Sequence, residues 1–290
     1  MTPKTRKFIK LALKLLISGG LLYIVFINVD LESLFLLMKR SNPLLLVLAT
    51  LFFIVSKILS AYRLNVFQKE SRIYLRDSVN LKLYWLGMYY NMFLPGGIGG
   101  DGYKIYYLKK HRKVSFRKLV LVMLFDRVTG VISLVFMILL LSIFIPESGL
   151  NIYILAVAAV LIVAIFYLTV RMKFRSYFRH LNRTNLQSLG VQISQMICAF
   201  LILRALAEDH NTLTYLVIFL VSSLAAVIPL TIGGIGLREM AFLYAAKLFN
   251  LNVTVSLSLS LLFFLITAIV SLAAFPLSIQ SNLIEGKASD

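Results

Sequence analysis

The sequence predicts an all-α, polytopic integral membrane protein built as an inverted repeat. Of its 290 residues, 60% are hydrophobic, and the mean hydropathy is +0.88, whereas soluble domains are roughly 45–50% apolar. Several apolar segments reach the length of about 20 residues that a membrane-spanning helix needs. One short motif also occurs twice. Little chain is left for a soluble domain, so we treat residues 1–290 as a single transmembrane domain.

Six apolar segments are predicted to span the membrane. They are Phe8–Val29, Leu44–Val66, Leu119–Ile145, Ile152–Val170, Leu186–Leu206 and Val253–Ile279. The first follows a basic N-terminus, as in a signal peptide. It exceeds the roughly 7–15 apolar residues of such a peptide and no A-x-A-like cleavage site follows, so we expect an uncleaved helix. Phe67–Lys82 is predicted to be a short amphipathic segment at the interface, and Lys104–Lys118 a basic loop.

The repeated motif indicates two re-entrant hairpins. Residues 95–104 and 229–238 align without a gap as P-x-x-I-G-G-x-G-x-[KR], and apolar sequence lies on both sides of each copy. Non-helical backbone is tolerated at membrane depth only where protein or a water-filled cavity covers it. We therefore predict hairpins at about 83–103 and 213–249.

The offset from Pro95 to Pro229, which relates the two motifs, also relates the spans. Shifting the second and third spans by this offset brings them onto the fifth and sixth. The chain thus divides into residues 8–145 and 150–279, each with three spans and one hairpin. An odd number of spans gives the halves opposite orientations. Many transporters are built this way, with their binding site at the repeat interface.

The net charge of +18 agrees with a positive-inside distribution. If both termini are cytoplasmic and both hairpins re-enter, most of the 30 Lys and Arg residues face the cytoplasm. We therefore expect a multi-pass protein of the inner (plasma) membrane. Nucleic-acid binding is excluded, because no basic run is interleaved with stacking aromatics.

Charged residues in or beside the apolar segments are the candidates for substrate binding. They are Asp101, Lys104, Asp126, Arg127, Arg238, Glu239 and Arg63. An ionisable group at membrane depth costs at least about 2.5–3.5 kcal/mol, so it usually lines a polar pathway or pairs with another group. Asp126 and Arg127 are neighbours on one helix and cannot pair with each other. The alternative for Lys104, Arg238 and above all Arg63 is a cation that snorkels to the interface.

The hairpins contain a second set of candidates, which are Pro95, Gly99, Gly100, Pro229, Gly233, Gly234 and Gly236. A glycine-rich break before a helix exposes backbone N–H groups, which suit a phosphate or carboxylate. The alternative is that these residues only allow the chain to turn and pack closely.

Enzyme signatures are lacking. The three histidines fall in predicted loops without metal-ligand spacing, and there is no P-loop, G-x-S-x-G or H-E-x-x-H pattern. We predict no catalytic residues, metal or cofactor, and a transporter in preference to an enzyme.

The motifs resemble those of a known family. The resemblance is carried by residues 91–95, Gly99-Gly100-Asp101, Asp126-Arg127 with Gly130, Ile228-Pro229 and residues 233–239. The pattern is similar to the lysylphosphatidylglycerol synthase transmembrane region family, which includes the flippase half of the bifunctional lysylphosphatidylglycerol synthetase/flippase. The resemblance covers nearly the whole chain. It implies movement of a membrane phospholipid or polyprenyl-linked lipid between leaflets.

The chain departs from the family pattern at three positions. Lys104 stands where arginine is frequent, Asp126 where glutamate is frequent, and Leu64 where tryptophan is common. A soluble aminoacyl-transfer domain is not among these residues, so we do not expect them to make lysylphosphatidylglycerol by that route.

Two other functions stay open at this stage. One is a membrane-embedded transferase on a lipid-linked substrate, which a strict divalent-metal requirement or a covalent change in the lipid would favour. The other is a non-catalytic partner that positions a peripheral lipid- or glycan-modifying enzyme on the basic segments Lys104–Lys118 and Arg171–Arg183. In that case, neutralising these segments abolishes function while Asp101→Asn and Arg238→Gln do not.

The predicted topology can be tested by cysteine labelling in a chain from which Cys198 has been removed. Cysteines at Arg112 and Arg179 should be labelled only from the cytoplasmic side, and one at Glu208 only from outside. Labelling of position 112 from outside would contradict the hairpin and the inverted repeat.

Overall fold

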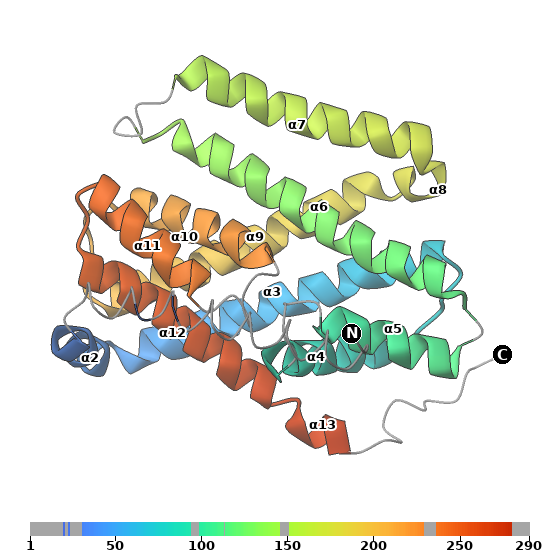
Figure 1. The fold of residues 1–290 in the computed structure, drawn as a ribbon, viewed down its shortest axis with the longest axis horizontal. Coiled ribbons are helices and arrows are strands. Elements are labelled where there is room, and N and C mark those ends of the chain that lie inside the picture. The colour runs from blue at the N-terminus through green and yellow to red at the C-terminus, as the bar shows by residue number, and fades with distance from the viewer. Residues whose placement is uncertain are drawn as a thin grey trace, which may run out of the picture. The chain divides into compact units, whose positions relative to one another are not determined.

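The computed structural model describes residues 31–93, 99–112, 114–145, 151–228 and 236–279, together with Gly20 and Tyr23, and its helices are shown in Figure 1. They are α2 (Leu31–Arg40), α3 (Pro43–Glu70), α4 (Asp77–Phe93), α5 (Gly99–His111), α6 (Phe116–Ser142), α7 (Ile152–Lys173), α8 (Arg175–Phe178), α9 (Leu181–Ala205), α10 (Thr212–Val227), α11 (Leu237–Leu248), α12 (Val253–Leu272) and α13 (Phe275–Ile279). The described residues contain no β-strand. The predicted all-α membrane fold is therefore confirmed.

Five of the described helices are long and apolar enough to cross a bilayer, namely α3, α6, α7, α9 and α12. They correspond to the second to sixth predicted spans. The predicted first span, Phe8–Val29, lies outside the described residues except for Gly20 and Tyr23, which are helical. The 27 residues of α6 extend roughly 40 Å at 1.5 Å per residue, so its ends reach past the hydrocarbon core of about 30 Å.

Two predicted boundaries are wrong. Phe67–Lys82 is no separate interfacial segment, because α3 continues to Glu70 and α4 begins at Asp77. The basic loop Lys104–Lys118 is mostly helical, since α5 runs to His111 and α6 begins at Phe116. Lysine and leucine are good helix formers, so a positively charged segment need not be a loop.

The described helices repeat with the spacing of the motif, the offset from Pro95 to Pro229. Shifting α4 by this offset gives 211–227, which overlaps α10, and shifting α6 gives 250–276, which overlaps α12. Shifting α3 and α5 gives 177–204 and 233–245, which overlap α9 and α11. The opposed orientation of the halves and the re-entrant course of α4–α5 and α10–α11 stay predictions.

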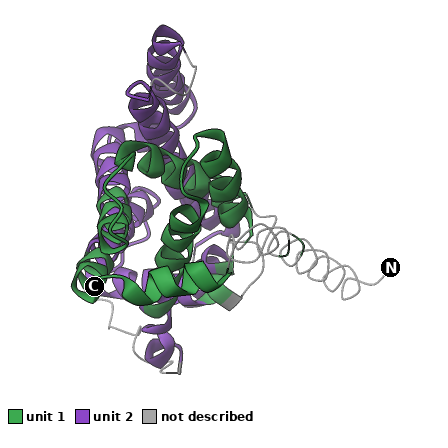
Figure 2. Ribbon diagram, turned by 90° about the vertical axis from the view of Figure 1, so that its left-hand side faces the viewer, with its two compact units in different colours: residues 1–51, 90–99, 196–269 green, residues 52–89, 100–195, 270–290 purple. Residues whose placement is uncertain are grey.

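The chain forms two compact units, coloured green and purple in Figure 2. Unit 1 comprises residues 1–51, 90–99 and 196–269, and includes α2, α10, α11 and most of α12. In this unit α10 packs against α11. The backbone N–H of Asn42, just before α3, donates to the carbonyl of Ala205 at the end of α9, over 2.9 Å.

Unit 2 comprises residues 52–89, 100–195 and 270–290, and includes α6, α7, α8 and most of α3, α4, α5 and α9. Here α6 packs along α7 (Figure 1). Trp85 of α4 donates from Nε1 to the carbonyl of Val270, at 2.8 Å. This bond satisfies a carbonyl near the C-terminal end of α12, where backbone acceptors lack helical partners.

An aromatic cluster in unit 2 fixes the short helix α8 against α3 and α6. Tyr177 of α8 stacks on Phe125 of α6, with ring centroids 4.3 Å apart, and Phe67 of α3 lies within 6.0 Å of both rings. The Tyr177 hydroxyl shares a 2.6 Å hydrogen bond with Ser71. Burial, aided by the Glu70 carboxylate, raises the pKa of the Tyr177 phenol, so the hydroxyl stays neutral and able to donate.

We expect this cluster to contribute measurably to stability. Tyr177→Ala should lower the free energy of unfolding by about 3–5 kcal/mol, because a large buried ring is lost. Tyr177→Phe should cost only about 1 kcal/mol, since it removes one hydrogen bond and keeps the ring. Thermal unfolding in detergent measures both. Equal effects would show that the hydroxyl, and not the stacking, holds α8.

Candidate functional site

The first turn of α5 provides a buried carboxylate that binds two cations. Asp101 lies in that turn, where the helix dipole favours negative charge. Its Oδ1 accepts from Lys104 Nζ at 3.0 Å and its Oδ2 accepts from Arg127 Nε at 2.5 Å. The Asp101 and Lys104 side chains are only 13% and 7% exposed. Asp101 is therefore the residue that joins α5 to α6.

Lys104 is also held by α4. Its ammonium lies 4.5 Å from the centre of the Tyr84 ring, a cation–π contact that strengthens when water is excluded. The side chain is buried, so the snorkelling alternative for Lys104 is wrong. Tyr84 is not among the site residues that the sequence predicts.

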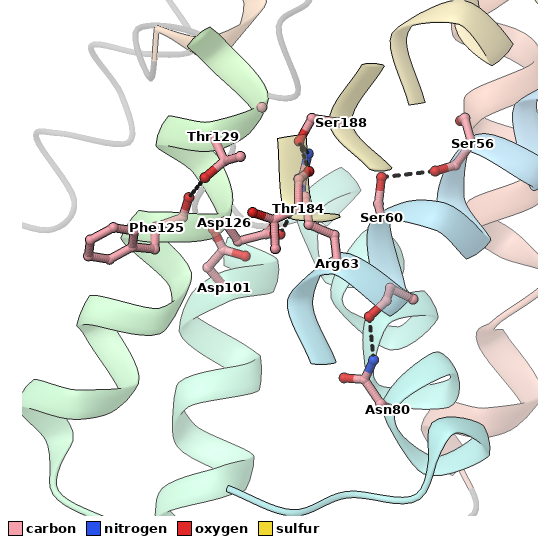
Figure 3. Close-up of polar contacts among 12 residues, drawn as sticks. Ser56, Ser60, Arg63, Asn80, Asp101, Phe125, Asp126, Thr129, Thr184 and Ser188 are labelled. Atoms are coloured by element: carbon pink, nitrogen blue, oxygen red, sulfur yellow. Dashed lines mark hydrogen bonds and ion pairs between the residues drawn. The ribbon is translucent and has the colours of Figure 1, made fainter. Parts of the chain in front are cut away.

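A second buried ion pair lies between α3 and α6 (Figure 3). Arg63 donates from Nε to Asp126 Oδ1 at 2.8 Å and from Nη1 to Ser188 Oγ of α9 at 2.9 Å. The two charged side chains are 7% and 11% exposed. The expectation that the Arg63 side chain snorkels to the interface is therefore wrong, because the side chain is buried and paired with Asp126 of α6.

Asp126 and Arg127 link these two ion-pair groups. They are consecutive residues of α6 and face different neighbours, Asp126 toward Arg63 and Arg127 toward Asp101. The sequence required a separate partner for each, and the structure provides both. Three cations and two carboxylates thus meet in unit 2, which leaves one positive charge in excess.

Two glycines leave room for the side chains of Lys104 and Arg63. A Cβ built at Gly87 of α4 would lie 2.6 Å from Lys104 Cε, and one at Gly130 of α6 would lie 3.3 Å from Arg63 Nη1. Gly130 is one of the residues that carry the family resemblance, whereas Gly87 has no signal in the sequence.

Unit 1 contains a different cation site at the start of α11. The Arg238 guanidinium lies 4.6 Å from the Phe263 ring centre and 5.5 Å from that of Phe219. Its Nη2 donates to Ser223 Oγ at 2.8 Å. Its Nε is buried and has no hydrogen-bond partner among the described residues, so Arg238 has an unused donor.

Glu239 is buried beside Arg238 and stabilises the helix start. Its Oε2 accepts from the backbone N–H of Gly236 at 2.7 Å, and its Oε1 accepts from Ser260 Oγ of α12 at 3.0 Å. Gly236 has φ 87°, a conformation that glycine adopts readily. Both oxygens of Glu239 are therefore bound to neutral donors.

The remaining hairpin candidates are only partly described. Gly99 begins α5 and Gly100 is buried in it. Pro95, Pro229, Gly233 and Gly234 lie outside the described residues. Among the residues that the structure describes, no three His, Cys, Asp or Glu side chains come together to hold a metal ion.

The repeat marks the two cations but not the rings beneath them, because Tyr84 and Phe219 are not at equivalent positions of the repeat. Lys104 and Arg238 occupy the equivalent last positions of the two motif copies. In each unit the cation lies over a ring of the preceding helix, Tyr84 of α4 or Phe219 of α10. Ser188 of α9 and Phe263 of α12 have no such marker, because they come from helices outside the motif.

Fold and site define a polytopic α-helical membrane protein with paired charges buried in its helical bundle. The family model of the lysylphosphatidylglycerol synthase TM region matches residues 11–274. The chain belongs to this family, as its motifs indicated, and thus to membrane proteins of lipid biology. No curated protein matches it.

The Arg63–Asp126 pair gives a stability prediction. Asp126→Leu should lower the free energy of unfolding by about 3–5 kcal/mol, because Arg63 is left buried without a counter-charge. The double variant Arg63→Met/Asp126→Leu should regain most of that loss. Thermal unfolding of the two variants tests this prediction. A double variant that is less stable than Asp126→Leu would show that the two residues contribute independently.

Proposed function

We propose that this protein moves a lipid head group between the leaflets of the plasma membrane, without covalent chemistry. The observation that carries the proposal is the buried Asp101 carboxylate, which binds Lys104 and Arg127 at once. A bundle that needed only stability gains little from such a group, because apolar residues of similar volume often serve as well or better.

The charge balance of unit 2 favours an anionic ligand. One positive charge is in excess among the five residues Arg63, Asp101, Lys104, Asp126 and Arg127 that form these ion pairs. A lipid phosphate could replace Asp101 as the partner of Lys104 and Arg127. Arginine and lysine are suited to this, since both bind phosphate through charge-assisted hydrogen bonds.

An exchange of partners would keep the cations paired while a head group passes. Removing one member of a buried pair is strongly unfavourable because the other is left uncompensated. If phosphate arrives as Asp101 leaves, the cations remain paired throughout. The acyl chains stay in the bilayer, so only the polar head needs a path.

Arg238, in unit 1, is a separate candidate for binding an anion. Its buried Nε has no partner among the described residues, and its guanidinium is held by two phenyl rings rather than a carboxylate. An incoming anion therefore does not have to displace a bound acid there. Membrane phospholipids and polyprenyl-linked lipids both carry the phosphate that this chemistry recognises.

The test is lipid movement in proteoliposomes that contain fluorescent lipids with several head groups. Wild-type protein should move lipids selectively by head group, and Asp101→Asn and Arg238→Gln should each lose most of that activity. Arg204→Gln is the matched control, because Arg204 pairs with Asp209 on the exposed surface, where ion pairs contribute at most about 1 kcal/mol.

Folded protein that moves none of the lipids would contradict the proposal. Covalent change of an added lipid would instead identify a transferase. Unchanged movement in both site variants would place the lipid path elsewhere in the bundle.

A further inference from the structure

The side chain of Lys104 crosses α4 where α4 has no side chain. A Cβ at Gly87 would lie 2.6 Å from Lys104 Cε and 3.6 Å from its Cδ. Real Cβ atoms essentially never approach within 3.0 Å. The lysine stem therefore occupies the volume that any other residue at position 87 would fill.

Tyr84 and Gly87 act together on this lysine. They are three residues apart on α4, so they lie on the same helix face. The centre of the Tyr84 ring lies 4.5 Å from the Lys104 ammonium, and Gly87 faces Cδ and Cε of the same side chain. At the end of the stem, Nζ reaches Asp101 Oδ1 at 3.0 Å.

The usual structural reason for a helix glycine does not apply here. A glycine often allows two backbones to approach closely. The nearest backbone atom to a Cβ at Gly87 is the Gly100 carbonyl oxygen, at 3.4 Å, which is an ordinary van der Waals distance. An alanine Cβ at position 87 would therefore fit against the backbone of α5 but would clash with the Lys104 side chain.

We propose that Gly87 is a positioning residue that fixes the ammonium of Lys104 against Asp101. The proposal that this ammonium binds lipid phosphate rests on the proposed function above, whereas the positioning itself does not. An added methyl at position 87 would push the flexible lysine end aside. The helices would stay in place, and the ammonium would leave Asp101.

The first arm of the test needs no transport. Lys104→Ala and Asp101→Asn, alone and together, give the coupling between these residues as the non-additive part of their melting-temperature shifts. We expect this coupling in the wild-type background and its loss in the Gly87→Ala background. Persistence of the wild-type coupling in Gly87→Ala would overturn the proposal.

Gly190→Ala is the matched control. It also adds a methyl within a helix of unit 2, but the nearest atom to it is Leu59 Cδ1 at 3.2 Å, an apolar contact away from Lys104. The coupling should survive there. If Gly87→Ala does not fold, Gly87→Ala/Lys104→Ala should, because the obstructing stem is gone. Failure of that double variant would place the conflict in the backbone and overturn the proposal.

The second arm is the lipid movement assay. Gly87→Ala should move lipid at least ~10-fold more slowly than wild type, because a misplacement of about 1 Å can cost that much or more in a positioned site. Its melting temperature should fall below that of Gly190→Ala, because the Lys104–Asp101 coupling is lost. Loss of coupling with full lipid movement would support the positioning role of Gly87 and remove Lys104 from the lipid site.

Discussion

Pairing of buried charge is the constraint on which the rest of unit 2 depends. Five ionised side chains lie among apolar helices, where an unpaired charge costs several kcal/mol. Each carboxylate therefore has to meet a cation from another turn or another helix. Asp101 meets two, one on its own helix and one on α6. Asp101 thereby ties α5 to α6.

The adjacency of Asp126 and Arg127 has a structural consequence. Neighbouring side chains on a helix project about 100° apart, so one helix can serve two ion pairs on different sides. A rotation of α6 that strained the Arg63–Asp126 pair would also strain the Asp101–Arg127 pair. Helix α6 therefore connects the two ion pairs.

The sequence predicted which residues belong to the site better than it predicted their contacts. Charges stand out in apolar segments, so Asp101, Asp126 and Arg63 could be found without a structure. Their partners could not, because a partner depends on how each helix is rotated about its axis. The expectation that Arg63 snorkels failed for this reason. Gly87 gave no signal at all, since its importance lies in the volume it leaves for a side chain of another helix.

Helix boundaries show the same limit. The charge of Lys104–Lys118 predicts a loop, yet α5 continues to His111. Charge alone does not mark a loop, because helix formation depends on propensity and capping. In the second predicted hairpin the sequence does contain a capping pattern, because Glu239 follows Gly236 by three residues. That spacing lets a carboxylate reach back to the helix start, as Glu239 does.

The equivalent cations of the two halves are held by different chemistry, and this difference bears on mechanism. Lys104 is bound to a carboxylate that any anionic ligand must displace. Arg238 is held by aromatic rings and a hydroxyl, and its Nε has no hydrogen-bond partner within the part of the chain that the structure describes. Binding at Lys104 thus carries an exchange cost that binding at Arg238 does not. Both cations lie over an aromatic ring, so the asymmetry comes from the Asp101 carboxylate that Lys104 binds in addition.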